Sequence, residues 1–297
     1  MDKREYVIVT DSTCDMGDQY YEVNGITVIG LHYTIGSRTY TQGAHDELSI
    51  QHYYERIRDG IVPKTSPVEY EDVVPVLDKI AQEGKDVFYL AFSSGLGASY
   101  QNAQIAAEDI MAKYPECTIK VVDSLTAAGG EGLLLHLCVK KKTAGAALDD
   151  LVSYAERMKN HIVGLFTVDN LHHLQRGGRI SKVSAVVGSI MQVKPLLHVD
   201  AAGHLDSYSK VKGRKKSLET LAEHMNTKYL PGENEEVFII DADNSSDAEF
   251  LGTLVTRKMP DVKRIRYCKI GPVIGAHTGA DTIGIFFVGK NRNPIEE

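Results

Sequence analysis

The sequence Val87-Phe-Tyr-Leu-Ala-Phe92, followed directly by Ser93-Ser94-Gly95-Leu96-Gly97-Ala98, carries the strongest indication of the fold. Six apolar residues in succession, without polar alternation, predict a strand that is buried on both faces of its sheet. The loop leads into residues 99–113, where apolar residues recur with the 3.6-residue period of a helix, and Tyr114-Pro115 ends that helix. A buried strand, a loop and a helix form the repeating unit of a parallel α/β sheet.

The same unit extends in both directions through the first half of the chain. Strands are predicted over residues 6–10, 26–31 and 118–122, and helices over residues 48–58, 68–83, 127–142 and 146–159. We therefore predict an α/β domain whose parallel sheet is covered by helices on both faces.

The second half of the chain has a different pattern, in which strands also follow one another directly. Pro195–Val199 and Leu205–Val211, joined by a turn that contains Gly203, predict a β-hairpin. Further strands are predicted over residues 162–168, 236–241, 264–268 and 282–288, and helices over residues 170–176, 181–192, 218–229 and 248–258. This mixture predicts an α+β domain with a mixed or antiparallel sheet. The two domains would span residues 1–160 and 161–297.

The composition excludes several classes of protein. The chain of 297 residues has 33 Lys and Arg against 40 Asp and Glu, a net charge of −7, whereas a general nucleic-acid binder needs clustered positive charge. No stretch supplies the roughly 20 apolar residues of a membrane helix, and residues 6–9 are too few for the core of a signal peptide. The four cysteines are widely separated and predict free thiols, so we expect a cytoplasmic protein.

Small polar residues follow three of the predicted parallel strands. They are Asp11-Ser12-Thr13, Ser93-Ser94 and Asp123-Ser124. Since the carboxyl ends of parallel strands meet at one edge of the sheet, their hydroxyls and the neighbouring helix N-termini would form a receptor for a small anionic group. The alternative is that each of these residues caps the helix that follows it.

Gly95 and Gly97 raise the alternative of a dinucleotide site, with Asp123 as the acceptor for a ribose hydroxyl. Tyr100 occupies the position at which a dinucleotide fingerprint needs its third glycine for close helix packing, which counts against this alternative. A nest of hydroxyl and amide groups for a carboxylate or phosphate fits the loop better.

Titratable residues offer few further candidates, because the motifs of serine hydrolases, nucleotide-binding loops and zinc proteases are missing. His277 lies in Gly271–Gly279, which we interpret as a flexible apolar loop, and its role is either structural or that of a general base or hydrogen-bond donor. His172 and His173 would point about 100° apart on a helix and make a poor metal pair. Lys212–Lys216 brings cations to the start of a helix, where the dipole disfavours them, so we expect a partner or a phosphate group there.

Seven short motifs follow one another from Tyr6 to Val288. They are Asp11-Ser12-Thr13, Lys64-Thr65-Ser66-Pro67, Ser93-Ser94-Gly95-Leu96, Arg176-Gly-Gly-Arg179-Ile180-Ser181, Lys194-Pro195, Gly213-Arg214-Lys215-Lys216 and Gly275-Ala-His277-Thr278-Gly279. Together they resemble the DegV family, a fatty-acid-binding group that includes the acyl-binding subunits of bacterial fatty-acid kinase. The resemblance implies a DegV-like two-domain fold, with a long-chain acid held between the domains.

The resemblance also implies a set of site residues. The carboxylate of a palmitate-like fatty acid would bind Thr65 and Ser94, with Ser93, Ser66, His277 and Thr278 nearby. A kinase partner or the acyl phosphate would meet Arg214, Lys215 and Lys216, with Arg176 and Arg179 acting similarly or bracing the glycine turn.

The implied function is that of a non-catalytic carrier in lipid transport or fatty-acid metabolism, which presents its ligand to a separate kinase. It implies no cofactor, metal or nucleic-acid partner, and allows a transient contact with a membrane surface. The alternative is an enzyme of acyl or phosphoryl transfer that uses His277 and the strand-end serines.

Three motifs depart from the family form, at Pro67-Val68-Glu69, Gly97-Ala98-Ser99 and Ala280-Asp281. The departures flank Thr65, Ser94 and His277, which are themselves retained, so a head group other than a simple fatty acid is the open alternative.

Overall fold

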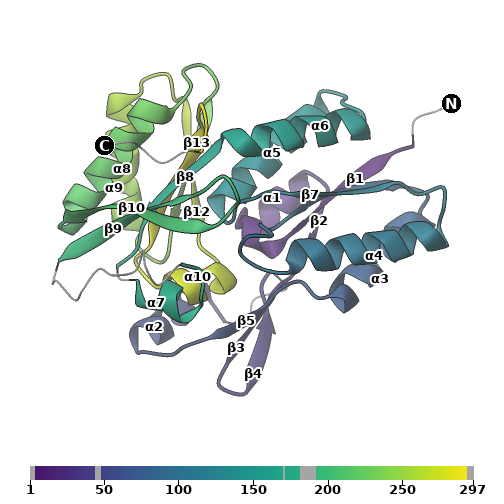
Figure 1. The fold of residues 1–297 in the computed structure, drawn as a ribbon, viewed down its shortest axis with the longest axis horizontal. Coiled ribbons are helices and arrows are strands. Elements are labelled where there is room, and N and C mark those ends of the chain that lie inside the picture. Colours follow the sequence, from purple (N-terminus) through teal and green to yellow (C-terminus); the bar gives the residue numbers. More distant parts are fainter. Residues whose placement is uncertain (1–3, 44–47, 170, 181–191, 293–297) are drawn as a thin grey trace.

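A computed structural model describes residues 4–43, 48–169, 171–180 and 192–292 (Figure 1). The amphipathic helix predicted over residues 181–192 lies outside the described residues except for Gln192. Within the described ranges, no helix combines the length and the apolar character that crossing a membrane would require.

The first half of the chain forms the predicted parallel sheet, which we call sheet A. Its strands stand in the order β2 (Ile26–Ile29), β1 (Tyr6–Asp11), β6 (Asp86–Ala91) and β7 (Ile119–Asp123), all parallel. Figure 1 shows α3 (Tyr70–Gln82) and α4 (Ser99–Lys113) on one face, and α5 (Gly129–Thr143) and α6 (Leu148–Met158) on the other. The predicted α/β architecture is therefore confirmed for this half of the chain.

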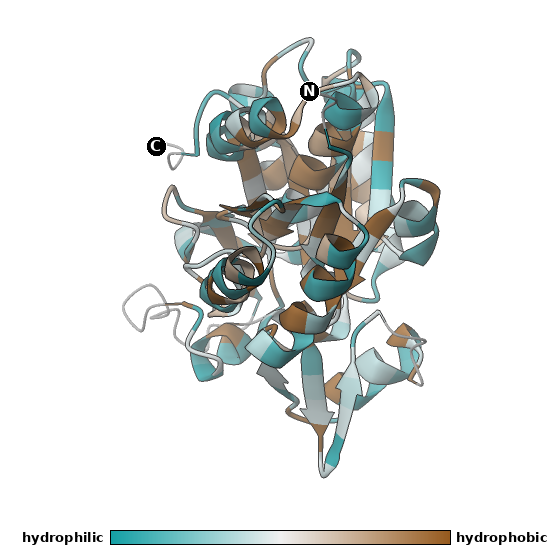
Figure 2. Cartoon of the chain, turned by 90° about the vertical axis from the view of Figure 1, so that its right-hand side faces the viewer, coloured by the Kyte–Doolittle hydropathy of each residue, from teal (hydrophilic) through white to brown (hydrophobic). Residues whose placement is uncertain are grey.

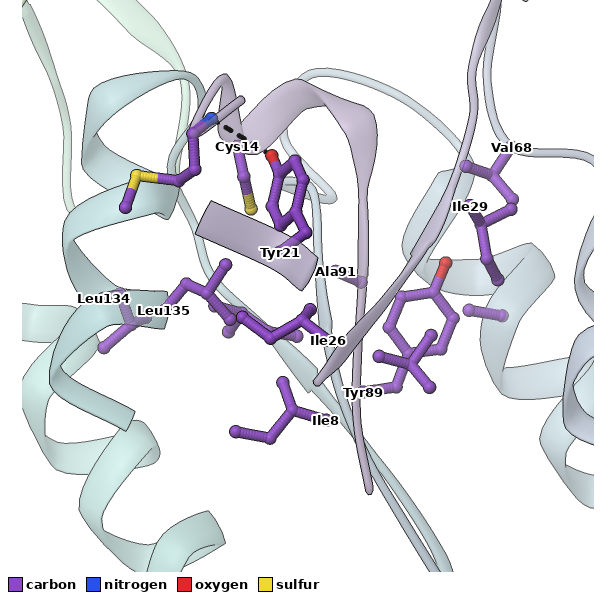
Figure 3. Packing of buried hydrophobic residues seen from close by; sticks show 14 of the residues in the cluster. Ile8, Cys14, Tyr21, Ile26, Ile29, Val68, Tyr89, Ala91, Leu134 and Leu135 are labelled. Atoms are coloured by element: carbon purple, nitrogen blue, oxygen red, sulfur yellow. Dashed lines mark hydrogen bonds between the residues drawn. The ribbon is translucent and has the colours of Figure 1, made fainter. Parts of the chain in front are cut away.

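Side chains of sheet A alternate between its two helical layers. Ile8 stands opposite Ile26 and Phe88 in the register, so these residues share one face, whereas Tyr89 belongs to the other. Figure 3 shows Ile8 and Ile26 on the same side as Leu135 of α5, with Tyr89 on the far side of the strands. Both faces are buried, which explains the unbroken apolar runs of β1 and β6.

The second half forms a six-stranded mixed sheet, which we call sheet C. Its order is β10 (Leu205–Lys212), β9 (Val193–Val199), β8 (Ile162–Thr167), β13 (Ile283–Val288), β11 (Glu236–Asp241) and β12 (Arg264–Lys269). Neighbouring strands are antiparallel except β11 and β12, which are parallel. The predicted hairpin and the mixed sheet are thus confirmed. Helices α8 (Arg214–Lys228) and α9 (Ser245–Lys258) pack on one face.

Helix α5 lies between the two sheets. It packs against the face of sheet A that carries Ile8 and also contacts β8, β11 and β13 of sheet C. Nine of its fifteen residues are buried, among them Leu133, Leu134 and Leu135, because the first part of the helix is enclosed by the two sheets, whereas Lys140 and Lys141 near its end are exposed. One apolar core therefore contains residues of both sheets, and Figure 2 shows the most hydrophobic segments gathered in the middle of the molecule.

A small antiparallel sheet, sheet B, is absent from the sequence-based prediction. Its order is β4 (Arg38–Thr41), β3 (His32–Ile35) and β5 (Lys64–Ser66). The strands are short and largely polar, so neither length nor alternation marks them in the sequence. Sheet B holds Thr65 and Ser66 on β5 and fixes their register by pairing Thr65 with Tyr33.

The short elements complete the connections. They are η1 (Ser12–Cys14), α1 (Asp18–Val23), α2 (Ile50–Arg58), η2 (Lys159–His161), α7 (His172–Arg176) and α10 (Pro272–Thr278). The interpretation of Gly271–Gly279 as a flexible loop is wrong, because α10 is a helix there. Pro272 stands in its first turn, where the fixed φ of proline suits a helix, and Gly279, with φ 81°, ends it.

Candidate functional site

A largely apolar cavity of about 270 Å³ lies where the two sheets, sheet B and α10 meet. Its wall is contributed by β5, the loop after β6, Ala127 and Ala128 just before α5, the face of sheet C that packs on α5, and α10. Apolar side chains of this wall include Leu31, Phe92, Leu96, Leu174, Phe166, Ile240, Val273, Ile274 and Phe286. Because most wall atoms are carbon, the cavity suits an aliphatic group rather than a polar metabolite.

One part of the wall is polar. Thr65 Oγ1 on β5 and His277 Nε2 on α10 lie 2.8 Å apart, at hydrogen-bond distance, although 212 positions separate them in the sequence. Both residues border the cavity. The pairing of β5 with β3 and the short helix α10 hold the two side chains at this distance.

The imidazole of His277 is neutral at physiological pH. Burial, followed by the positive charges of Arg179 and Arg176, lowers the pKa of His277 to about 4. A side chain at residue 177 would collide with Nδ1 of His277, and glycine at this position leaves room for the ring. A neutral imidazole has a single N–H, so His277 can donate only one hydrogen bond.

Arg179 borders the cavity and brings a positive charge to its polar part. Its Nε donates to the Leu96 carbonyl at 3.3 Å, and its guanidinium also donates to the Gly177 carbonyl. Arg179 therefore braces the glycine turn and faces the cavity as well. Arg176, by contrast, is exposed and contacts His173 Nδ1 at 2.9 Å.

The hydroxyl groups predicted to bind a carboxylate differ in what they already bind. Ser66 and Thr278 border the cavity, but the Thr278 hydroxyl donates to the Ile274 carbonyl at 3.2 Å. Ser93 is fully buried, and its hydroxyl donates to the Gly203 carbonyl at 3.0 Å. Neither Ser93 nor Ser94 is among the described residues that line the cavity.

The strand-end carboxylates hold the loops in place. Asp11 accepts from the Phe92 amide at 2.8 Å and from the Thr13 amide at 3.0 Å. Asp123 accepts from the amides of Ser94 and Leu125, at 3.2 Å and 2.9 Å. Asp11 therefore caps η1, as the capping alternative predicts, whereas Asp123 bonds the loops and does not cap α5, whose N-cap residue is Ala128. The polar groups of the cavity described above come from β5, α10 and Arg179 instead.

A dinucleotide does not fit at the loop after β6. The β9–β10 turn covers this loop, and a Cβ at Gly95 would lie only 2.8 Å from the Ala202 carbonyl oxygen. Asp123, the suggested ribose acceptor, is occupied by backbone amides. A pyrophosphate group would have to displace this turn.

The basic residues at the start of α8 have partners within the chain. Arg214 Nε donates to Asp247 Oδ2 at 2.7 Å, and the same guanidinium donates to the carbonyl of Asp281. The Lys215 ammonium lies 6.0 Å from the ring centroid of Phe250, and that of Lys216 lies 3.7 Å from Glu223. These partners offset the unfavourable position of cations at a helix N-terminus.

Sequence reasoning misses most of the cavity wall. Phe166, Ile240 and Phe286 are apolar strand residues, and nothing in the sequence separates a residue that lines a cavity from one that fills a core. The sequence analysis also gives Arg179 a role in partner contact or in the glycine turn and misses its position beside the cavity. That position depends on how the segment after α7 packs against α10, which the sequence does not show. Among the described ranges, no cluster of His, Cys, Asp and Glu is arranged to hold a metal ion.

Fold and site together define a class: an α/β protein with two sheets separated by a helix, and with an apolar cavity that has one small polar region. A family model described as "Uncharacterised protein, DegV family" matches residues 5–290. The chain belongs to the DegV family.

Individual relatives agree over nearly their full length. A DegV domain-containing protein of Clostridium perfringens is 38% identical over 291 residues, which cover 98% of this chain and 100% of the relative. A Thermotoga maritima structure described as revealing fatty acid binding function is 28% identical, with a TM-score of 0.83 and 96% and 99% of the two chains covered. A stearic acid-binding protein of Eubacterium ventriosum is 26% identical, with a TM-score of 0.85 and coverage of 96% and 98%.

Proposed function

We propose that this protein binds a long-chain fatty acid, with the acyl chain in the cavity and the carboxylate at Thr65 and His277. The observation that carries the proposal is the Thr65–His277 pair beside Arg179, in the wall of an otherwise apolar cavity. Structures of relatives that are described as fatty-acid-binding support it.

The hydrogen-bond donors of Thr65 and His277 indicate how the carboxylate would be held. When Nε2–H of neutral His277 donates to Thr65 Oγ1, the Thr65 hydroxyl is free to donate its own proton to a carboxylate. The guanidinium of Arg179 adds a favourable positive charge nearby, and the hydroxyl of Ser94, between Phe92 and Leu96 of the wall, is a further candidate donor. Each CH₂ group of the chain that leaves water contributes about 0.8 kcal/mol.

We further propose that the protein is a carrier, which presents the carboxylate to a separate kinase through Arg214, Lys215 and Lys216. His277 supports the carrier role over that of an enzyme, because within the described part of the chain no carboxylate lies close enough to orient it as a base. Four buried free cysteines agree with a reducing compartment such as the cytoplasm.

The first test is binding itself. Mass spectrometry of the denatured protein should detect co-purified acyl chains, and the delipidated protein should bind added palmitate in a calorimetric titration. A protein that carries no lipid and binds no palmitate would rule out the proposal. Incubated alone with ATP and palmitate, it should form no acyl phosphate; turnover would instead favour an acyl- or phosphoryl-transfer enzyme.

The second test separates the head group from the chain. Thr65→Val keeps the shape of the side chain but removes its hydroxyl, and we expect palmitate affinity to fall by about tenfold or more, because a hydrogen bond to a charged group is lost. Thr278→Val is the matched control, since Thr278 also borders the cavity but its proton is already donated to Ile274. Equal affinities in the two variants would reject Thr65 as the carboxylate donor.

A further inference from the structure

The ring of Phe286 is held in place by three glycines. A Cβ atom at Gly129 would lie 2.8 Å from Cδ2 of the ring, on one edge, and a Cβ at Gly130 would lie 2.9 Å from Cδ1, on the other edge. A Cβ at Gly164 of β8 would lie 2.5 Å from Cε1. The ring is 3% exposed and borders the cavity.

Backbone conformation does not require these glycines, because none of the three has a positive φ. Glycine is moreover an unfavourable choice in the first turn of α5 and within strand β8. The close approach of the Phe286 ring explains Gly164. At Gly129 and Gly130 the ring acts together with two other side chains: Ile240 Cγ2 would lie 2.6 Å from a Cβ at Gly129, and Thr126 Oγ1 would collide with a Cβ at Gly130. Backbone atoms, rather than side chains that could change rotamer, therefore stand behind the ring.

Phe286 lies at a distance from the polar region of the cavity. Thr282 and Phe286 both line the cavity and lie four residues apart near the start and end of β13, which corresponds to about 13 Å along a strand. The Thr282 hydroxyl donates to the carbonyls of Thr278 and Gly279, at the end of α10 that carries His277. Gly284 lies midway between Thr282 and Phe286 and is covered by Ile240 and Phe166, which both line the cavity: a Cβ at Gly284 would lie 3.0 Å from Ile240 Cγ1 and 3.2 Å from Phe166 Cβ.

We propose that the Phe286 ring is the end wall of the acyl cavity and sets the longest chain that the protein accepts. The proposal rests on the fatty-acid function proposed above. A chain that starts at Thr65 and His277 would run parallel to β13, over Ile240 and Phe166, and would meet the ring. The ring cannot withdraw, because Gly129, Gly130 and Gly164 are in contact with its edges.

Two substitutions should change the longest acyl chain that the cavity accepts in opposite directions. Phe286→Ala removes the ring and opens space for additional methylene groups, each of which raises affinity about fourfold when it is buried. Gly164→Ala places a methyl group against Cε1 and pushes the ring into the cavity, so the longest chains lose affinity about fourfold for every methylene that no longer fits.

The experiment measures affinities of the delipidated variants for saturated fatty acids from laurate to arachidate. We expect the preferred length to increase in Phe286→Ala and to decrease in Gly164→Ala. Phe287→Ala is the matched control: Phe287 is fully buried on the same strand, but it packs in the cluster formed with α8 and α9, on the opposite face. Its length profile should equal that of the wild type.

The outcomes distinguish this inference from the function on which it rests. If the wild type binds no fatty acid, the proposed function fails. If the wild type binds but the profiles of Phe286→Ala and Gly164→Ala match its own, only the end-wall proposal is overturned. Should Phe286→Ala fail to fold, Phe286→Leu tests the same shift at smaller amplitude, alongside Gly164→Ala.

Discussion

His277 shows how one buried side chain couples stability to pH. The pKa of its imidazole is about 4 in the folded protein, because of burial and then of Arg179 and Arg176, against an ordinary value near 6.5. Between these values the unfolded chain binds a proton that the folded chain does not bind. The contribution to stability is therefore complete above about pH 6.5 and is lost as the pH falls toward 4.

The substitution His277→Gln should weaken this dependence. The glutamine side chain would keep an N–H donor for Thr65 but would not titrate, so the free energy of unfolding should change less between about pH 7 and pH 5, by at most about 2 kcal/mol. Urea unfolding of the delipidated protein at both pH values measures the difference. Parallel pH profiles for wild type and variant would contradict the assignment.

At the scale of elements, the β9–β10 turn and the loop after β6 are packed closely together and joined by a hydrogen bond. Ser93 donates to Gly203, and a Cβ at Gly203 would collide with the Ser93 hydroxyl and lie 3.0 Å from Leu125 Cα. The φ of Gly203 is 81°, a left-handed conformation in which any side chain is strained.

Gly203→Ala should therefore destabilise the protein by more than backbone strain alone. Gly232→Ala is the control, because φ is 83° there and no atom lies within 4 Å of the position of a Cβ. We expect Gly232→Ala to cost about 1–2 kcal/mol and Gly203→Ala to cost about 1–3 kcal/mol more, from overpacking. Denaturant unfolding measures the loss of unfolding free energy in both variants. Equal losses would show that the turn is not tightly packed against Ser93.

The elements also show where sequence reasoning succeeds and where it stops. The bounds of α4 and β11 follow from periodicity and from terminating residues, since strong local patterns determine them. Sheet B has no such pattern, and the sequence of α10 resembles a loop because its glycines are weak helix formers in isolation. The family resemblance suggests Thr65 and His277 as head-group residues, whereas their contact depends on tertiary packing that no local pattern encodes.

At the scale of the whole molecule, Arg292 joins the two halves of the chain. It is 3% exposed, and its guanidinium donates to carbonyls of Ser124 and Leu125 after sheet A and of Ile162 and Asp200 in sheet C and its turn. Burial lowers the pKa of Arg292 to about 10, which still leaves it charged at neutral pH.

Arg292→Leu should lower the free energy of unfolding by about 3 kcal/mol or more, because several buried carbonyl groups lose their donor together. Arg257→Leu is the control, since Arg257 is exposed on α9, and we expect a change within about 0.5 kcal/mol. Thermal and denaturant unfolding of both variants measure the difference. Similar stabilities would mean that Arg292 does not link the halves energetically.

Helix α5, packed between sheet A and sheet C, has a consequence for how this chain can change during evolution. The buried residues of α4 have one set of neighbours to satisfy, because the outer side of that helix faces water. Leu133, Leu134 and Leu135 of α5 are instead enclosed, so a substitution there must suit two layers at once. The buried part of the helix that separates the sheets therefore has less freedom to accept mutations than α4, and changes in the facing residues of either sheet are constrained through it.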